Sequence, residues 1–148
     1  MSNEVVEVNT NAEIKTLFTG FTVGGVSVPV SLLVYQGHGE PYVVYTQYDQ
    51  DNSYSTEDEI AGYVTYYDFD VYSKGNILPI IKAVKQKFKG TPWIWEPSRD
   101  SQILYDTDTG YFHKTICFAR PVQEVETPEP EEQTENQIIG GLTNEQDN

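Results

Sequence analysis

The stretch that most constrains the fold is a tyrosine-rich segment that leads directly into an amphipathic pattern, within residues 61–90. Its first part, residues 61–75, reads AGYVTYYDFDVYSKG, and this density of β-branched and aromatic residues favours a strand. The odd positions form the more apolar face of this strand. The even positions include Asp68 and Asp70, so they predict a face that is wet or covered by a partner.

The hydrophobic period then changes to three and four residues. Residues 73–76 have the composition of a turn. Pro79 suits the first turn of a helix, because its missing N–H needs no partner there, and Gly90 is typical of a helix end. The apolar residues of this segment predict a core-facing stripe made of Ile77, Ile80 or Ile81, Val84 and Phe88. The sequence therefore predicts a strand, a short turn and a helix.

Weaker patterns predict the remaining elements. A short helix is expected over residues 11–18, and residues 26–35 are expected to form an edge or bulged strand because Pro29 cannot donate a backbone hydrogen bond. Further strands are expected over residues 42–48, 101–105 and 111–119. Together they predict an α+β domain over residues 1–120, in which four or five mostly antiparallel strands are packed on one face by two helices.

A polar connector, residues 49–59, separates two of the predicted strands and is expected to form a long, projecting hairpin loop. Its acidic residues lack the alternating oxygen spacing of a calcium loop, so they predict a solvated or pore-facing loop in place of a metal site. These residues are Asp49, Asp51, Glu57, Asp58 and Glu59.

The net charge of −14 is distributed unevenly along the chain. Residues 121–148 carry eight acidic residues and no Lys or Arg, and their Pro-containing composition predicts a flexible acidic tail. An acidic protein without a basic face binds nucleic acid poorly, because neutralising phosphates supplies most of that affinity. The chain has no signal-peptide pattern and no membrane-spanning apolar run, which favours a soluble protein made inside the cell, with no membrane partner.

Lysines cluster on and before the predicted central helix, at Lys74, Lys82, Lys85, Lys87 and Lys89. One interpretation is a solvated helix face whose cations suit the C-terminal end of the helix dipole. The other is a docking stripe for an acidic neighbour, which could be another copy of this chain.

Catalytic motifs are absent from the sequence: it has no Gly-rich phosphate loop, HExxH, GxSxG or CxxC. The two histidines, His38 and His113, fall in a predicted loop and a predicted strand. The single cysteine, Cys117, is predicted to be a buried structural thiol. The sequence therefore predicts no enzyme, no catalytic or metal-binding residues and no cofactor.

The aromatic residues are more informative about function. The chain has eleven Tyr, two Trp and six Phe, which is more aromatic surface than a small domain buries easily. Protein interfaces are enriched in Tyr and Trp, which bury a large area while a polar tip stays satisfied. The predicted subunit interface comprises Tyr63, Tyr66, Tyr72, Lys82, Lys85, Lys89, Trp93 and Trp95.

The order of these segments resembles a known family. After a predicted helix and a PV-containing strand come YxGxGxPYVVYTQYDQ, a polar connector, YVTYYDFDVYSKGNILPIIKAVKQKFKG and a last hairpin with TGYFHKTICFA. This order is similar to that of the tail terminator, or tail-to-head joining, proteins of long-tailed bacteriophages, over about residues 10–120. The resemblance rests on element order and short motifs, such as the Tyr72-Ser73 turn, and does not include the acidic tail.

The resemblance implies a structural subunit of the virion, assembled in the host cytoplasm. Such subunits form a ring, usually six-fold, that caps the tail tube and joins it to the neck. Its partners would be other copies of itself, the tail tube protein and a head-closure or neck protein. The acidic connector, residues 49–59, would suit a channel wall along which DNA slides, and no catalytic residue transfers from the family.

Three alternatives remain open from the sequence. The first is another neck or minor capsid adaptor protein with a similar fold. The second is a small acidic binding module that inhibits a host protein by mimicking nucleic acid. The third is a small enzyme that acts through Asp68, Asp70 or His113.

Overall fold

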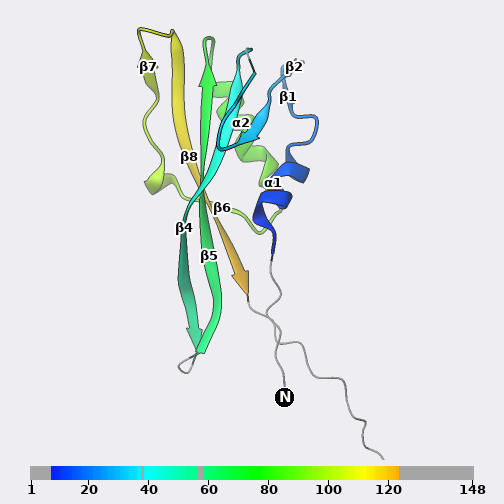
Figure 1. Ribbon diagram of the computed structural model, residues 1–148, viewed down its shortest axis with the longest axis vertical. Helices are drawn as coiled ribbons and strands as arrows, with labels where there is room; N and C mark the ends of the chain where they lie inside the picture. Colours follow the sequence, from blue (N-terminus) through cyan, green and yellow to red (C-terminus); the bar gives the residue numbers. More distant parts are fainter. Residues whose placement is uncertain (1–7, 38, 57–58, 124–148) are drawn as a thin grey trace, which may run out of the picture. The chain divides into compact units, whose positions relative to one another are not determined.

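The computed structural model describes residues 8–37, 39–56 and 59–123 of the chain (Figure 1). The predicted acidic tail therefore lies outside the described residues from position 124 onward. The described elements are, in chain order, α1 (Thr10–Leu17), β1 (Thr22–Val23), β2 (Val26–Ser27), β3 (Val30–Leu32), β4 (Tyr42–Thr56), β5 (Glu59–Ser73), α2 (Leu78–Lys87), β6 (Ile94–Trp95), the 3-10 turn η1 (Pro97–Arg99), β7 (Leu104–Asp106) and β8 (Tyr111–Gln123).

Six of these strands form one mixed sheet in the order β3-β4-β5-β8-β6, with β7 also paired to β8. The pairs β4–β5 and β5–β8 are antiparallel, whereas β3 runs parallel to β4. The predicted α+β class and its two helices are confirmed. The prediction of four or five mostly antiparallel strands differs in two respects, because the sheet has six strands and one pair is parallel.

The parallel strand occupies the position that its proline predicts. Val30 to Leu32 lies at the edge of the sheet, where the carbonyl of Pro29 accepts a hydrogen bond from the Val43 amide at 2.8 Å. At an edge, the missing N–H of a proline costs no ladder hydrogen bond. The predicted strand over residues 26–35 is confirmed only as an edge strand over Val30–Leu32, because Val26–Ser27 (β2) pairs with β1 in a separate two-stranded sheet.

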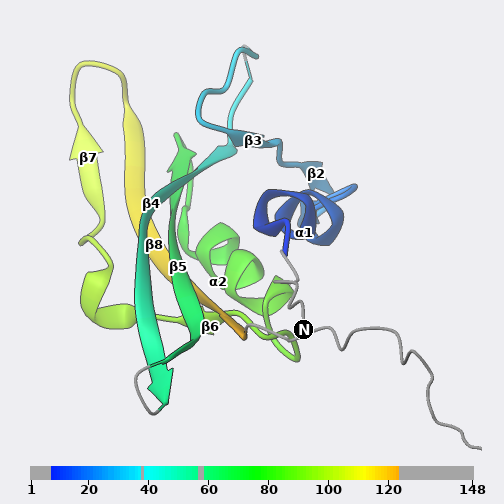
Figure 2. The same ribbon diagram turned by 60° about the horizontal axis from the view of Figure 1, so that its bottom comes forward.

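Both α-helices lie on the same side of the sheet (Figure 2). Between them and the sheet lies the hydrophobic core, at whose centre the fully buried Phe69 ring contacts Phe88 and Phe118, with ring centroids 5.2 and 5.7 Å away. The predicted helical stripe is confirmed, since all its members are buried: Ile77, Ile80, Ile81, Val84 and Phe88.

Local chemistry at the two ends of α2 explains its bounds. The Asn76 side-chain oxygen accepts a hydrogen bond from the Leu78 amide at 3.1 Å, and Pro79 occupies the first turn. Beyond the last turn, Gly90 adopts a φ of +76°, which a residue with a Cβ rarely adopts. The strand–turn–helix prediction is therefore confirmed.

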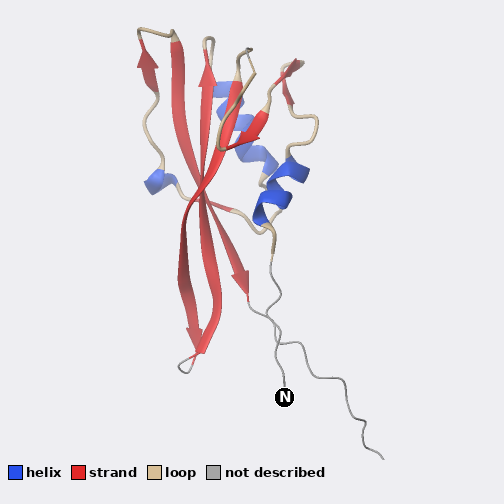
Figure 3. Cartoon of the chain, viewed as in Figure 1, coloured by secondary structure: helices blue, strands red, loops and turns tan. Residues whose placement is uncertain are grey.

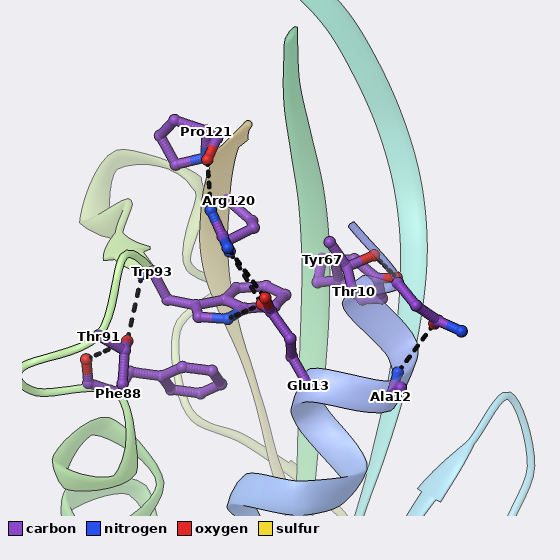
Figure 4. A network of polar contacts seen from close by, with 10 residues as sticks. Thr10, Ala12, Glu13, Tyr67, Phe88, Thr91, Trp93, Arg120 and Pro121 are labelled. Carbon is purple, nitrogen blue, oxygen red and sulfur yellow. Dashed lines mark hydrogen bonds and ion pairs between the residues drawn. The ribbon is translucent and has the colours of Figure 1, made fainter. Parts of the chain in front are cut away.

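The helix α1 is fixed to the sheet by a polar network (Figure 4). The Asn9 side chain caps its start by accepting from the Ala12 amide at 3.0 Å. One turn on, the Glu13 carboxylate accepts hydrogen bonds from Arg120 of β8, at 2.9 Å to each oxygen, and from the indole of Trp93 at 3.0 Å. The hydrogen bonds from Arg120 lower the pKa of Glu13.

Replacing Glu13 with Gln is expected to lower the free energy of unfolding by about 1–2 kcal/mol at neutral pH, because the bidentate charged pair with Arg120 is lost. A carboxylate whose pKa is lowered by folding stabilises the folded state above its ordinary pKa, here 4.5, and loses that effect as the pH falls further. Urea unfolding should therefore show a difference from wild type that shrinks below about pH 4.

The matched control for this experiment is Glu96→Gln, because Glu96 forms no ion pair with another described residue. Its unfolding curves should stay close to those of wild type at every pH. A Glu13→Gln effect that is the same at acidic and neutral pH would contradict the assignment.

The predicted hairpin loop over residues 49–59 is wrong for most of its length. β4 continues to Thr56 and β5 already begins at Glu59, so the two strands form one long hairpin (Figure 3). Pairing with β5 satisfies the backbone of this polar segment, and three register shifts between Gln47 and Ser55 absorb its irregular sequence. Glu57 and Asp58 lie outside the described residues.

The last strand also differs from its prediction. β8 occupies an interior position in the sheet and runs to Gln123, which is four residues beyond the predicted end. It pairs with β5 along its length, from Phe112 opposite Ser73 to Gln123 opposite Gly62. The strand thus passes through position 120, where the sequence placed the end of the domain.

Candidate functional site

Seven of the eight predicted interface residues lie on two separate surfaces. Five of them line one groove beside α2, namely Lys82, Lys85, Lys89, Trp93 and Trp95. Tyr66 and Tyr72 lie on the sheet face opposite the α-helices, because they alternate with the buried Tyr67 and Phe69. Tyr63 shares the helix-side face with Tyr67 and lies outside both surfaces.

On the helix-free face, four rings stack across the strands. This aromatic ladder consists of Tyr35, Tyr42, Tyr72 and His113. Its consecutive ring centroids are 4.4, 4.8 and 4.5 Å apart, with interplanar angles of 22°, 20° and 2°. Tyr111 meets Tyr42 and Tyr72 edge-on, at 5.9 and 6.2 Å.

The ladder follows from the register of the sheet. Tyr42 of β4 is paired with Tyr72 of β5, which is in turn paired with His113 of β8. Cross-strand neighbours on one face lie about 5 Å apart, which is the distance that stacked rings need. All four rings keep part of their surface exposed, so the ladder presents an amphipathic aromatic strip to the solvent.

A second aromatic cluster lies further along the same face. Arg99 of η1 reaches over the sheet and places its guanidinium 4.1 Å from the centre of the Tyr66 ring. The same guanidinium donates a hydrogen bond to the hydroxyl of Tyr48, which is 44% exposed. A cation between two tyrosines fixes their rings in place while leaving them accessible.

Acidic residues lie between these two aromatic clusters. Asp70 accepts a hydrogen bond from the Thr115 hydroxyl and lies 3.4 Å from Nε2 of His113. Burial, together with the charge of Asp70, raises the pKa of Asp68 to about 6. Burial likewise raises the pKa of the Cys117 thiol, whose predicted burial is confirmed. The carboxylates of Asp68 and Asp70 and the imidazole of His113 lie on the face of the sheet. They line none of the three grooves found beside the helices, since those grooves have other lining residues.

Replacing Asp68 with Asn is expected to stabilise the protein above about pH 6. Folding raises the pKa of Asp68 from 3.8, so the stability that its protonated form supplies is complete below that value and is lost as the pH rises to about 6. Asn keeps the neutral form at every pH. Thermal midpoints of variant and wild type should therefore coincide near pH 3.5 and diverge between about pH 4 and pH 6. Parallel midpoint curves across this range would contradict the prediction.

The second surface, here called the basic-aromatic groove, lies between α2 and β6 and has a volume of about 520 Å³. Lys82 and Lys85 lie one turn apart on the same side of α2, and Lys89, two residues beyond its end, lines the same groove. The apolar part of its lining is aromatic and comprises Phe88, Trp93, Trp95 and Phe118.

Trp95 is the most accessible ring of this groove, with 41% of its surface exposed. Lys85 places its ammonium 3.7 Å from the centre of that ring, and the indole N–H donates to Asp100 at 2.9 Å. Trp93, by contrast, is 5% exposed and packs against Phe88. The groove thus combines a fixed aromatic surface with cations, which suits an acidic ligand.

The acidic residues predicted to face a channel lie on the long hairpin where they are described. Asp49 is paired with Tyr66, Asp51 with Val64 and Glu59 with Thr56. The other two predicted residues, Glu57 and Asp58, fall outside the described part of the chain. The sequence placed these acids in a loop between two strands, whereas Asp49, Asp51 and Glu59 belong to the strands themselves.

The sequence did not predict part of the aromatic ladder or the contact between Arg99 and the Tyr66 ring. Tyr35, Tyr42, Tyr111 and Arg99 were not expected at an interface, and His113 was expected as a cross-strand partner or, in the enzyme alternative, as a catalytic residue. The available signal was the antiparallel register, because one correct pair, Tyr42 with Tyr72, brings the other rings together.

No protein-family model matches the chain, and no curated protein shows significant similarity to it. Over residues 8–37, 39–56 and 59–123, no helix is long and apolar enough to span a membrane. The same residues contain no group of three or more His, Cys, Asp or Glu side chains placed to hold a metal ion.

Proposed function

We propose that this protein is a structural subunit of a bacteriophage virion that assembles into a ring. The ring caps the tail tube and joins it to the neck, as the resemblance in element order implies. The observation that carries the proposal is the helix-free sheet face, on which the aromatic ladder and the Tyr48–Tyr66–Arg99 cluster stay partly exposed. Exposed amphipathic rings in fixed positions are typical of protein interfaces.

The two surfaces of one copy differ in character. The helix-free face carries tyrosines with Asp68 and Asp70 between them, while the side of α2 carries lysines and tryptophans. Contact between unlike surfaces of identical copies is heterologous, and such a contact closes into a ring when its rotation allows it. This favours a ring over a two-fold dimer, and the family resemblance supplies the six-fold expectation.

The long acidic hairpin suits the same role. Asp49 and Asp51 lie on β4, and Asp68 and Asp70 lie on β5. A wall with negative charge repels DNA phosphates, so DNA passes along it without binding. Specific nucleic-acid binding is therefore not part of the proposed function.

The experiment that tests the proposal has two arms. Mass photometry of the purified full-length protein should show one closed oligomer, and immunogold labelling should locate the protein in purified tails. Signal in tail-less heads with none in tails would favour the other neck or adaptor role. A monomer at every concentration, absent from both tails and heads, would overturn the proposal.

A further inference from the structure

The basic-aromatic groove concentrates positive charge on an otherwise acidic protein. Its three lysines account for a third of the nine basic residues in the chain. None of the three forms an ion pair with a carboxylate of residues 8–37, 39–56 or 59–123. Two other bases, by contrast, have partners: Arg120 pairs with Glu13, and Lys114 donates to the Ser101 carbonyl. The groove therefore offers cations and exposed indole surface to a ligand from outside the described residues.

The ligand that this chemistry fits is an acidic, proline-containing peptide. Proline-rich segments dock in aromatic-lined grooves, and carboxylates pair with lysines at the rim. The chain itself contains such a segment at residues 124–135, with the sequence EVETPEPEEQTE, which has six Glu, two Pro and no basic residue. This segment follows directly after β8.

We propose that residues 124–135 of one copy bind in the basic-aromatic groove of a neighbouring copy. This inference rests on the proposed function: within the contact between the helix-free face of one copy and the α2 side of the next, it assigns the groove itself to the acidic segment. The acidic segment thereby becomes a strap that links each subunit to the next.

The spacing of the charges supports this assignment. Lys82 and Lys85 lie one turn apart on α2, about 5 Å along the helix axis, and Lys89 follows two residues beyond the end of the helix. In a polyproline II conformation, the two steps from Glu129 to Glu131 cover about 6 Å. Carboxylates on the bound segment would therefore reach the lysine pair of α2, while Pro128 and Pro130 pack on the indole of Trp95.

The course of β8 favours a neighbouring copy over the same chain. Phe118 lines the groove, and the strand carries the chain five residues further, about 17 Å, before it ends at Gln123. A segment binding its own groove would have to reverse direction immediately and run back beside β8. A segment from the next subunit has no such constraint.

Intrinsic fluorescence gives a direct readout, because the only two tryptophans of the chain, Trp93 and Trp95, both line the groove. The probe is a synthetic peptide of residues 123–136. The protein is the full-length chain with the six Glu of residues 124–135 changed to Gln, so that its own segment does not compete. We expect saturable binding with a blue shift of the emission, weakened as salt rises.

The matched controls alter charge without altering the fold. K82Q/K85Q/K89Q should weaken peptide binding by about tenfold or more, whereas K15Q/K74Q/K87Q removes the same charge outside the groove and should leave it within about twofold. A peptide with all six Glu changed to Gln should not bind. Equal weakening by both lysine triples, or no binding to the intact groove, would overturn the proposal.

Dilution separates binding to a neighbour from binding within one chain. The tryptophan emission of the wild-type protein should shift to the red on dilution, and by more than that of the protein with the six Glu-to-Gln changes, whose groove holds no acidic segment at any concentration. Emission of the wild type that is independent of concentration would overturn the assignment to a neighbouring copy. If rings form while the peptide fails to bind, this inference is wrong and the proposed function stands. If the peptide binds while the protein stays monomeric, the proposed function is the one that fails.

Discussion

Replacing Phe69 with Ala is expected to lower the free energy of unfolding by about 3–5 kcal/mol. Phe69 is fully buried at the centre of the core. Its ring contacts Tyr45 of β4, Phe118 of β8, and the residues that directly follow the two helices, Phe18 and Phe88. Alanine would leave a cavity that the surrounding rings can fill only by moving out of their present contacts. Because small domains are stable by only about 5–15 kcal/mol, this loss would be a large part of the total.

Urea unfolding measured by far-UV circular dichroism tests this expectation. The control is Tyr105→Ala, because Tyr105 is an aromatic strand residue that is 55% exposed. It should change stability by less than about 1 kcal/mol. A Phe69→Ala loss no larger than that of Tyr105→Ala would show that the core is not centred on this strand.

Replacing Tyr72 with Ala is expected to weaken association between copies by at least about thirtyfold, which is the effect of removing an interface hot spot worth about 2 kcal/mol. Tyr72 is the central ring of the aromatic ladder, held between Tyr42 and His113. Its removal breaks the stack, so the remaining rings lose their fixed positions as well as the contact area of one ring.

Mass photometry over a dilution series measures this effect. Tyr72→Phe keeps the ring and the stacking, so its association should stay close to that of wild type. Tyr105→Ala provides a control away from the ladder. If Tyr72→Ala assembles at the same concentration as wild type, the ladder is not part of the contact. Circular dichroism of each variant distinguishes lost association from lost folding.

Much of the fold was predictable because local signals and tertiary packing agree. In the strand–turn–helix unit, the two-residue period, the turn residues, Pro79 and Gly90 all indicate the structure that forms. The connector over residues 49–59 was not predictable in the same way. Its Asp, Asn and Ser residues favour turns locally, but pairing with β5 outweighs that preference. The parallel pairing of β3 was missed because nothing local specifies the direction of a neighbouring strand.

The candidate site likewise has a part that local sequence signals predict and a part that depends on strand pairing. Lys82, Lys85 and Lys89 recur at helical spacing, and the two nearby tryptophans are too apolar to stay in water, so the sequence indicated most of the basic-aromatic groove. The aromatic ladder depends on register, which relates residues 35, 42, 72 and 113 across four segments. Composition predicted that surplus aromatic rings exist, but only the pairing of the strands shows where they stack.

We propose that two unlike surfaces on each copy hold identical copies together in a ring. Negative-stain electron microscopy of the purified full-length protein, paired with its mass in solution, is the decisive experiment. We expect closed rings of a single size whose mass is an integral multiple of 16.8 kDa. Isolated protomers at micromolar concentration, or pairs related by a two-fold axis through the helix-free face, would contradict it.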